Sequence, residues 1–111
     1  MKIPNNTEAV VDINKIMDYL LSDTHDLGKH KAAFFKSFGF DKSSPAFFEE
    51  ALKTHAIVRE VVNKNDSPFG KKYQIECDIE TPDERNPCIV SVWIIENDSE
   101  VPRLITAYPA K

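Results

Sequence analysis

Two groups of polar residues in this 111-residue chain carry side chains that could act on a phosphodiester. The first group is His25, His30 and Lys31, in a loop and near the beginning of an expected helix. An imidazole titrates near neutrality and an ammonium is positively charged, which suits proton transfer and charge stabilisation. A helix N-terminus also favours an anion such as phosphate. The alternative interpretation is a histidine–lysine pair on the solvent-exposed edge of a helix.

The second group lies in the last expected strand, which begins at Arg103. Its alternation predicts Leu104, Thr106 and Tyr108 on one face. A threonine hydroxyl can orient a phosphate, and a tyrosine can donate a proton or stack on a base. The alternatives are a Thr and a Tyr at the edge of the core, bonded to backbone, and an arginine that protects a strand end.

The composition predicts one domain, residues 1–111, with residues 1–10 as a loose lead-in. Hydrophobic residues make up 41% and charged residues 29%, which is ordinary for a globular protein. The net charge of −4 argues against a protein that coats nucleic acid, although a nuclease needs only a local basic site. No apolar run approaches the roughly 20 residues of a membrane span, and we expect a cytoplasmic protein without membrane contact.

The two cysteines, Cys77 and Cys88, are interpreted as buried free thiols in a reducing compartment. They fit no zinc spacing and have no histidine at a recognisable distance. Glu76, Asp78 and Glu80 alternate along one strand, but without a matching histidine we do not expect a metal site. The sequence predicts neither a metal nor another cofactor.

Three helices are expected in the first half of the chain. Asp12 caps the first helix, which has apolar residues at helical spacing from Ile13 to Leu21. The second helix begins at Gly28 or Lys29 and runs to Phe38, before Gly39. Ser44 and Pro45 begin a third helix over about 45–55, with His55 at its C-terminal end, where a cation is favoured. Its expected buried stripe consists of Phe47, Phe48, Ala51 and Leu52.

From residue 57 the apolar period changes from near 3.6 to 2, which predicts strands over 57–63 and 70–80. A third strand begins at Cys88, and Arg103–Tyr108 forms the fourth. The third is apolar on both faces, with Trp93 in the core, which is typical of a central strand. Short connections favour an antiparallel meander. The fold class is therefore α+β, with three N-terminal helices packed on a four-stranded antiparallel sheet.

Three sequence blocks resemble a small uncharacterised bacterial domain family. They are YLLSDTHDLGKHKAAFFKSFGF (19–40), FGKKYQIECDI (69–79) and VSVWIIENDSEVPRLITAYP (90–109). The family pattern reads YLL…H..G..K..FF…GF, then G.KY, then VW and PRLVTAYP. Asp26 stands where the pattern has proline, which affects only the loop. The resemblance implies no established activity.

At a looser level, the helices, the sheet and the closing T-A-Y-P are similar to the barnase–EndoU–colicin–RelE-like nuclease superfamily. That superfamily includes ribonuclease domains of bacterial polymorphic toxins. The resemblance implies a site in which a His or Lys near the helices meets a Thr or Tyr late in the sheet. The matching positions are His25, Lys31, Arg103, Thr106 and Tyr108; the pattern does not require His30.

Two functional hypotheses follow, with a small-molecule enzyme or binder as a third. The first is a non-catalytic interaction module of a toxin/immunity-type system, whose acidic residues (Glu76, Asp78, Glu80, Asp83, Glu84) bind a basic protein partner. The alternative is a metal-independent endoribonuclease. There His25 or His30 transfers protons, Lys31 and Arg103 stabilise charge, and Thr106 and Tyr108 position the phosphate of an RNA. The enzyme requires these side chains to meet in one place.

Overall fold

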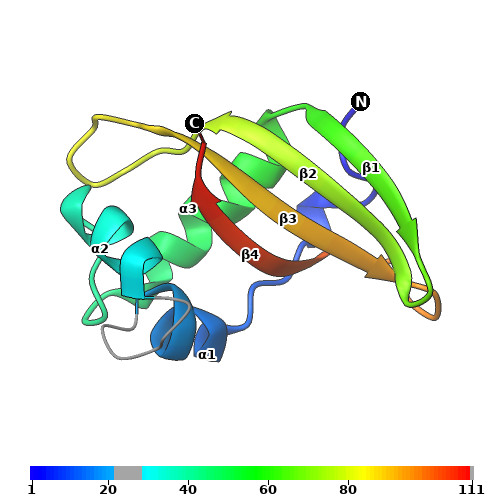
Figure 1. Ribbon diagram of the computed structural model, residues 1–111, viewed down its shortest axis with the longest axis horizontal. Coiled ribbons are helices and arrows are strands. Elements are labelled where there is room, and N and C mark those ends of the chain that lie inside the picture. The colour runs from blue at the N-terminus through cyan, green and yellow to red at the C-terminus, as the bar shows by residue number, and fades with distance from the viewer. Residues whose placement is uncertain (22–28, 111) are drawn as a thin grey trace.

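The computed structural model describes residues 1–21 and 29–110, and residues 15, 18, 19, 29 and 30 by their backbone alone. Four strands, β1 (Val61–Ser67), β2 (Gly70–Asp78), β3 (Cys88–Glu96) and β4 (Arg103–Pro109), form one antiparallel sheet in the order β1-β2-β3-β4. This confirms the expected meander, with β3 paired on both sides. Figure 1 shows α3 (Pro45–Val58) across one face of the sheet and α2 (Lys29–Ser37) near the β4 side. The α+β class is confirmed.

The prediction of three regular helices is wrong for the first of them. α1 covers only Ile13–Lys15 and continues as a π-helix, η2 (Ile16–Leu20), so that two longer α-helices are present in the described residues. The Leu21 N–H donates to the Ile16 carbonyl at 2.8 Å, five residues earlier. A turn of this width puts residues four and five apart on one side, and Ile16, Leu20 and Leu21 are all fully buried.

The boundary between α3 and β1 also differs from the prediction. Ile57 and Val58, expected in a strand, form the last turn of α3, and the Arg59 N–H closes it on the His55 carbonyl at 3.2 Å. The β-branched preference is weak and is overridden by tertiary context. The following turn moves to residues 68–69 and depends on Gly70, whose φ is 155°. A Cβ there would lie 2.3 Å from the Ile95 carbonyl oxygen.

The first ten residues, which the sequence predicts as a loose lead-in, are packed instead. Ile3 and Ala9 are buried, and a short 3-10 helix, η1, covers Asn6–Glu8. The Val61 N–H donates to the Met1 carbonyl, while Val10 exchanges two hydrogen bonds with the beginning of β4, at 2.8 and 3.0 Å. The segment therefore contacts β1 at one end and β4 at the other.

A buried polar network joins α3 to the sheet through His55, which is 1% exposed. Its Nε2 lies 2.8 Å from the Cys77 carbonyl, which can only accept, so Nε2 carries the proton. Its Nδ1 accepts from the Ser91 hydroxyl at 2.8 Å, and the Trp93 indole N–H donates to Ser91 Oγ at 2.9 Å. Trp93 is confirmed as a core residue. His55, which the sequence predicts as a cation at the C-terminal end of the helix, is instead buried against the sheet. Both of its nitrogens are satisfied by the sheet.

Burial lowers the pKa of His55 from 6.5, and the hydrogen bond to Cys77 only partly opposes this effect. Between the folded and unfolded pKa values, the unfolded chain binds more protons. We therefore expect the free energy of unfolding to fall as the pH decreases below about 6.5. Urea denaturation at about pH 7.5 and pH 5.5 measures this slope. A His55→Leu variant should lose this contribution; an unchanged slope in the variant would contradict the assignment to His55.

The two cysteines are free, as expected, but they are not both buried. Cys77 is exposed and Cys88 is half-buried. Cys77 has a φ of 116°, which interrupts the alternation of β2 and turns its side chain away from the core. Partial burial and a hydrogen bond with Cys77 raise the pKa of Cys88 to about 12. Cys88 is thus a thiol at neutral pH and a poor nucleophile.

Candidate functional site

The structure brings together Lys31, Thr106 and Tyr108, three of the residues that the sequence predicts for a site. Lys31 Nζ lies 3.1 Å from Thr106 Oγ1 and 5.6 Å from the centre of the Tyr108 ring. All three side chains are partly buried, and Lys31 comes from a position 75 residues before Thr106. The cluster joins α2 to β4, which contact each other. Figure 1 shows α2 on the β4 side of the sheet.

The position of Lys31 is determined by the aromatic core beneath α2. Phe35 lies one helical turn after Lys31 and therefore on the same side of α2. It is fully buried and packs against Phe48 of α3, with ring centres 4.7 Å apart. Phe48 in turn stacks on Phe40 at 4.4 Å. Because this cluster anchors α2, the amino group of Lys31 is carried to the outer strand of the sheet.

A β-bulge determines the positions of the two β4 side chains. Leu104 pairs with Trp93, but Thr106 pairs with Val92, so that Ile105 is an extra residue in β4. Leu104 faces the core, whereas Thr106 and Tyr108 belong to the opposite face, together with their β3 partners. The expectation that Leu104, Thr106 and Tyr108 share one face is therefore wrong. The expectation that Thr106 and Tyr108 lie on the same face of β4 is correct.

The structure does not bring Arg103 to this cluster. Arg103 begins β4, five residues and about 15 Å along the strand from Tyr108. Its Nε donates to the Glu96 carboxylate at 3.2 Å, and both side chains are exposed. His25 lies outside the described residues, and His30 is described only by its backbone in α2. The role of either histidine stays a prediction.

The cluster contains one cation, Lys31, and two hydroxyl groups, those of Thr106 and Tyr108, at a partly exposed edge of the sheet. A lysine ammonium has three donors and can bind a phosphate oxygen as a point charge. The Thr106 hydroxyl can donate to a second oxygen of the same group. Because the Lys31 ammonium is positively charged and the Thr106 hydroxyl lies 3.1 Å from it, the site suits an anion. In the described part of the chain, no group of three or more histidine, cysteine, aspartate or glutamate residues could hold a metal ion.

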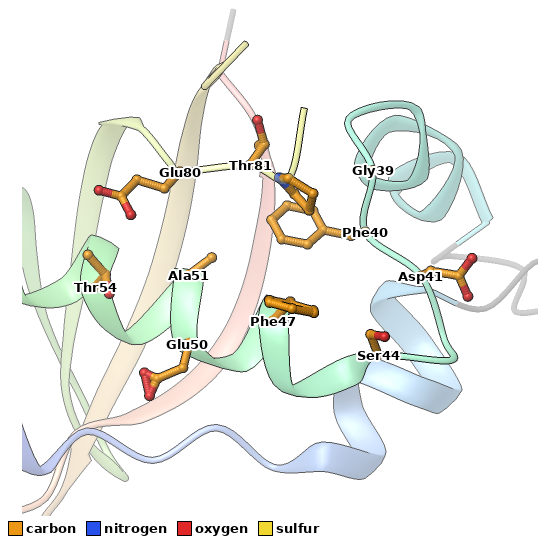
Figure 2. Close-up of a pocket in the computed structure, with 11 residues that line it drawn as sticks. Gly39, Phe40, Asp41, Ser44, Phe47, Glu50, Ala51, Thr54, Glu80 and Thr81 are labelled. Carbon is orange, nitrogen blue, oxygen red and sulfur yellow. The ribbon is translucent and has the colours of Figure 1, made fainter. Parts of the chain in front are cut away.

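A groove of about 540 Å³ on α3 is a second feature, which the sequence interpretation did not identify. Figure 2 shows Phe47 and Ala51 of α3 on one side and Thr81 on the other, with Phe40 between them. Phe47 is 68% exposed. The sequence predicts Phe47 in the buried stripe of the third helix, so this prediction is wrong. Its neighbour Phe48 takes the core position, because one helix residue turns the side chain by about 100°.

The fold is shared with a solved structure, a chain of the "Contact-dependent growth inhibition toxin - immunity protein complex from Klebsiella pneumoniae 342". The two chains are 23% identical with a TM-score of 0.72, over 96% of this chain and 97% of the other. At this identity the likeness shows the fold alone. No curated protein matches the sequence. Within the described residues, no helix is long and apolar enough to cross a membrane.

The sequence matches the model of an uncharacterised domain family over nearly its whole length. The match begins at residue 2 and ends at residue 111, so it includes both the helices and the whole sheet. It also includes Lys31, Thr106 and Tyr108. The chain therefore belongs to the family described as "Domain of unknown function (DUF6883)".

Proposed function

We propose that this protein is a metal-independent endoribonuclease with a site formed by Lys31, Thr106 and Tyr108. The observation that carries the proposal is the meeting of the Lys31 ammonium with the Thr106 hydroxyl at 3.1 Å beside the Tyr108 ring. These residue types suit phosphate chemistry, and α2 and β4 bring them together. A site for phosphoryl transfer needs such preorganised donors more than it needs covalent chemistry.

The reaction that fits these groups is internal transesterification of RNA. The 2′-hydroxyl loses its proton and attacks the adjacent phosphorus, and the 5′-oxygen leaves with a proton, which yields a 2′,3′-cyclic phosphate and a 5′-hydroxyl. Lys31 stabilises the additional negative charge on the phosphorane, and Thr106 orients a non-bridging oxygen. Tyr108 donates a hydrogen bond or a proton, or stacks on a base. A histidine, His25 or His30, is the proposed proton-transfer group.

The fold and the net charge are both compatible with this proposal. The chain has the fold of a chain from a toxin–immunity complex, which supports a role in a toxin-related system, as a toxin or as its partner. The negative net charge does not oppose it, since RNA would be bound locally by the cation on the α2–β4 edge. Arg103, in contrast, is ion-paired elsewhere and is not part of the proposed site.

The proposal is tested by incubating the purified protein with a mixed-sequence RNA in EDTA. We expect cleavage without added metal and products that end in 2′,3′-cyclic phosphate. A DNA oligonucleotide of the same sequence is the matched control, because it lacks the attacking 2′-hydroxyl and should stay intact. Uncut RNA, or equal cutting of RNA and DNA, would contradict the proposal.

A non-catalytic interaction module is the second candidate, and the surface charge favours it. The five acidic residues that the sequence predicts for a basic protein partner, Glu76, Asp78, Glu80, Asp83 and Glu84, are all exposed. Hydrogen bonds from Arg85 and Thr81 keep the pKa of Asp83 below its ordinary value despite the opposing effect of desolvation. This candidate is favoured if RNA stays uncut while the protein co-elutes with the co-expressed product of a neighbouring gene.

A further inference from the structure

We propose that the groove between α3 and the segment 80–82 binds an arginine side chain of a basic segment in a partner protein. The site is separate from Lys31, Thr106 and Tyr108, and shares no residue with them. The inference therefore does not rest on the ribonuclease activity. Shape, charge and rigidity of the groove lead to it independently.

The groove has a large apolar part, and serine and threonine residues also line it. Phe40, Phe47, Ala51 and Pro82 line it, and Figure 2 shows the Phe47 ring directed into the space between α3 and the opposite segment. Phe47 is 68% exposed, which is unusual for so large an apolar side chain at the mouth of a concave site. A side chain with a long aliphatic stem could cover this ring and remove apolar surface from water. A groove of about 540 Å³ is large enough for one such side chain and its neighbours.

The charge at the rim specifies a cation. Glu50 on α3 and Glu80 on the opposite wall are exposed. Figure 2 shows Asp41 at the Gly39–Phe40 end of the groove, with its carboxylate directed away from it. The carboxylates of Glu50 and Glu80 form no ion pair or hydrogen bond with another described residue. Two hydrogen bonds from Ser43 lower the pKa of Asp41, so that it is ionised at neutral pH. None of the residues that line the groove is a lysine, arginine or histidine.

Arginine fits this combination better than other ligands. Its guanidinium binds carboxylates in a planar geometry and stacks on an aromatic face, and both partners are present here. Its stem would lie on Phe47 while the head reaches Glu50 or Glu80. RNA and acidic membranes would be repelled by the same carboxylates. An arginine anchored in a pocket is also a common centre of protein–protein interfaces.

The opposite wall is held in place before any ligand binds. The Asp83 N–H donates to the Phe38 carbonyl at 3.3 Å, and the Arg85 guanidinium donates to the Ser37 carbonyl while stacking on Phe38 at 4.3 Å. These contacts tie the connection between β2 and β3 to the end of α2. Gly39, with a φ of 105°, permits this approach, because a Cβ would lie 3.0 Å from Pro82. A preformed groove avoids the cost of ordering a loop on binding.

The test is an NMR titration of the ¹⁵N-labelled protein with the tripeptide acetyl-Leu-Arg-Leu-amide. The matched probe is the same peptide with citrulline, which keeps the shape of arginine and removes its charge. We expect saturable shifts of the amides of Phe47, Thr54 and Thr81 with the arginine peptide. The affinity for the citrulline peptide should be lower by a factor of about ten or more, since the carboxylates lose their counter-charge.

Two variants make the test specific to the groove. The double substitution Glu50→Gln and Glu80→Gln should weaken the arginine peptide about ten-fold or more, whereas Glu100→Gln, an exposed acid on the β3–β4 turn, should leave binding unchanged. RNA cleavage by the double variant should equal that of the parent protein. The inference is overturned by equal binding of both peptides, by the absence of saturable shifts at the groove amides, or by unchanged affinity in the double variant.

Discussion

Replacing Lys31 by methionine is expected to lower the rate of RNA cleavage about 10²–10³-fold, because one preorganised charge donor to the phosphorane is removed. Methionine is unbranched and only one atom shorter than lysine, so that packing on α2 is largely preserved. Tyr108→Phe should lower the rate about 10²-fold if its hydroxyl donates a proton. Both rates are measured under single-turnover conditions, in which chemistry and product release are separated.

Arg103→Gln is the matched control for these variants. It also removes one positive charge from β4, but at the end of the strand that is remote from Tyr108. The charge removed belongs to an exposed ion pair between Arg103 and Glu96. An exposed pair of this kind contributes about 0–1 kcal/mol, so the fold should be retained. We expect the cleavage rate to stay within about two-fold of the parent. A loss comparable to that of Lys31→Met would show that bulk charge, and not the cluster, governs cleavage.

Replacing His55 by alanine is expected to lower the free energy of unfolding by about 3–5 kcal/mol, the largest stability effect that we predict for a polar residue. The substitution leaves a cavity between α3 and the sheet. It also leaves the Ser91 hydroxyl and the Cys77 carbonyl without their buried partner. Because Ser91 also accepts from Trp93, the indole contact is weakened as well. Urea denaturation at about pH 7.5, where the histidine is neutral, measures the loss.

Lys53→Ala is the control on the same helix, two residues before His55. Lys53 pairs with Glu49 one turn earlier at 3.2 Å on the outer face of α3. Such a pair stabilises a helix by about 0.2–0.5 kcal/mol, so this variant should be nearly as stable as the parent. Similar losses for both variants would mean that the buried network contributes no more than a surface contact.

Elements with a strong local signal agree with the sequence prediction. The strands beginning at Gly70, Cys88 and Arg103 start where they were expected, because alternation and turn residues are local properties. The helix after Ser44 also begins at Pro45 as predicted. The ends of elements were less predictable. Ile57 and Val58 look like a strand by residue type, but the helix that ends with them is set by the packing of Ala56 and His55 against the sheet.

For the candidate site as well, the sequence shows the residue types, whereas the tertiary structure determines which of them meet. The types and spacing of Lys31, Thr106 and Tyr108 are visible in the chain, and so is the phosphate chemistry that they allow. Their meeting depends on the aromatic cluster that anchors α2 and on the extra residue Ile105 in β4. A bulge leaves no clear mark in the sequence, since any residue can occupy it. The sequence also predicts Arg103 in the site, because residue types alone do not show which end of the strand lies beside Lys31. In the structure Arg103 lies at the opposite end of β4 from Tyr108.

The sequence by itself determined the α+β class, the antiparallel meander and the residue types of the candidate site, because periodicity, turn chemistry and side-chain charge are local properties. The tertiary structure decided which side chains meet: Lys31 with Thr106, His55 with Ser91, and Phe47 with an acidic rim. Lys31 and Thr106 lie 75 residues apart in the sequence, and His55 and Ser91 lie 36 residues apart. Their geometry follows from how the helices bury their apolar faces on the sheet, a property of the whole chain and not of any one segment.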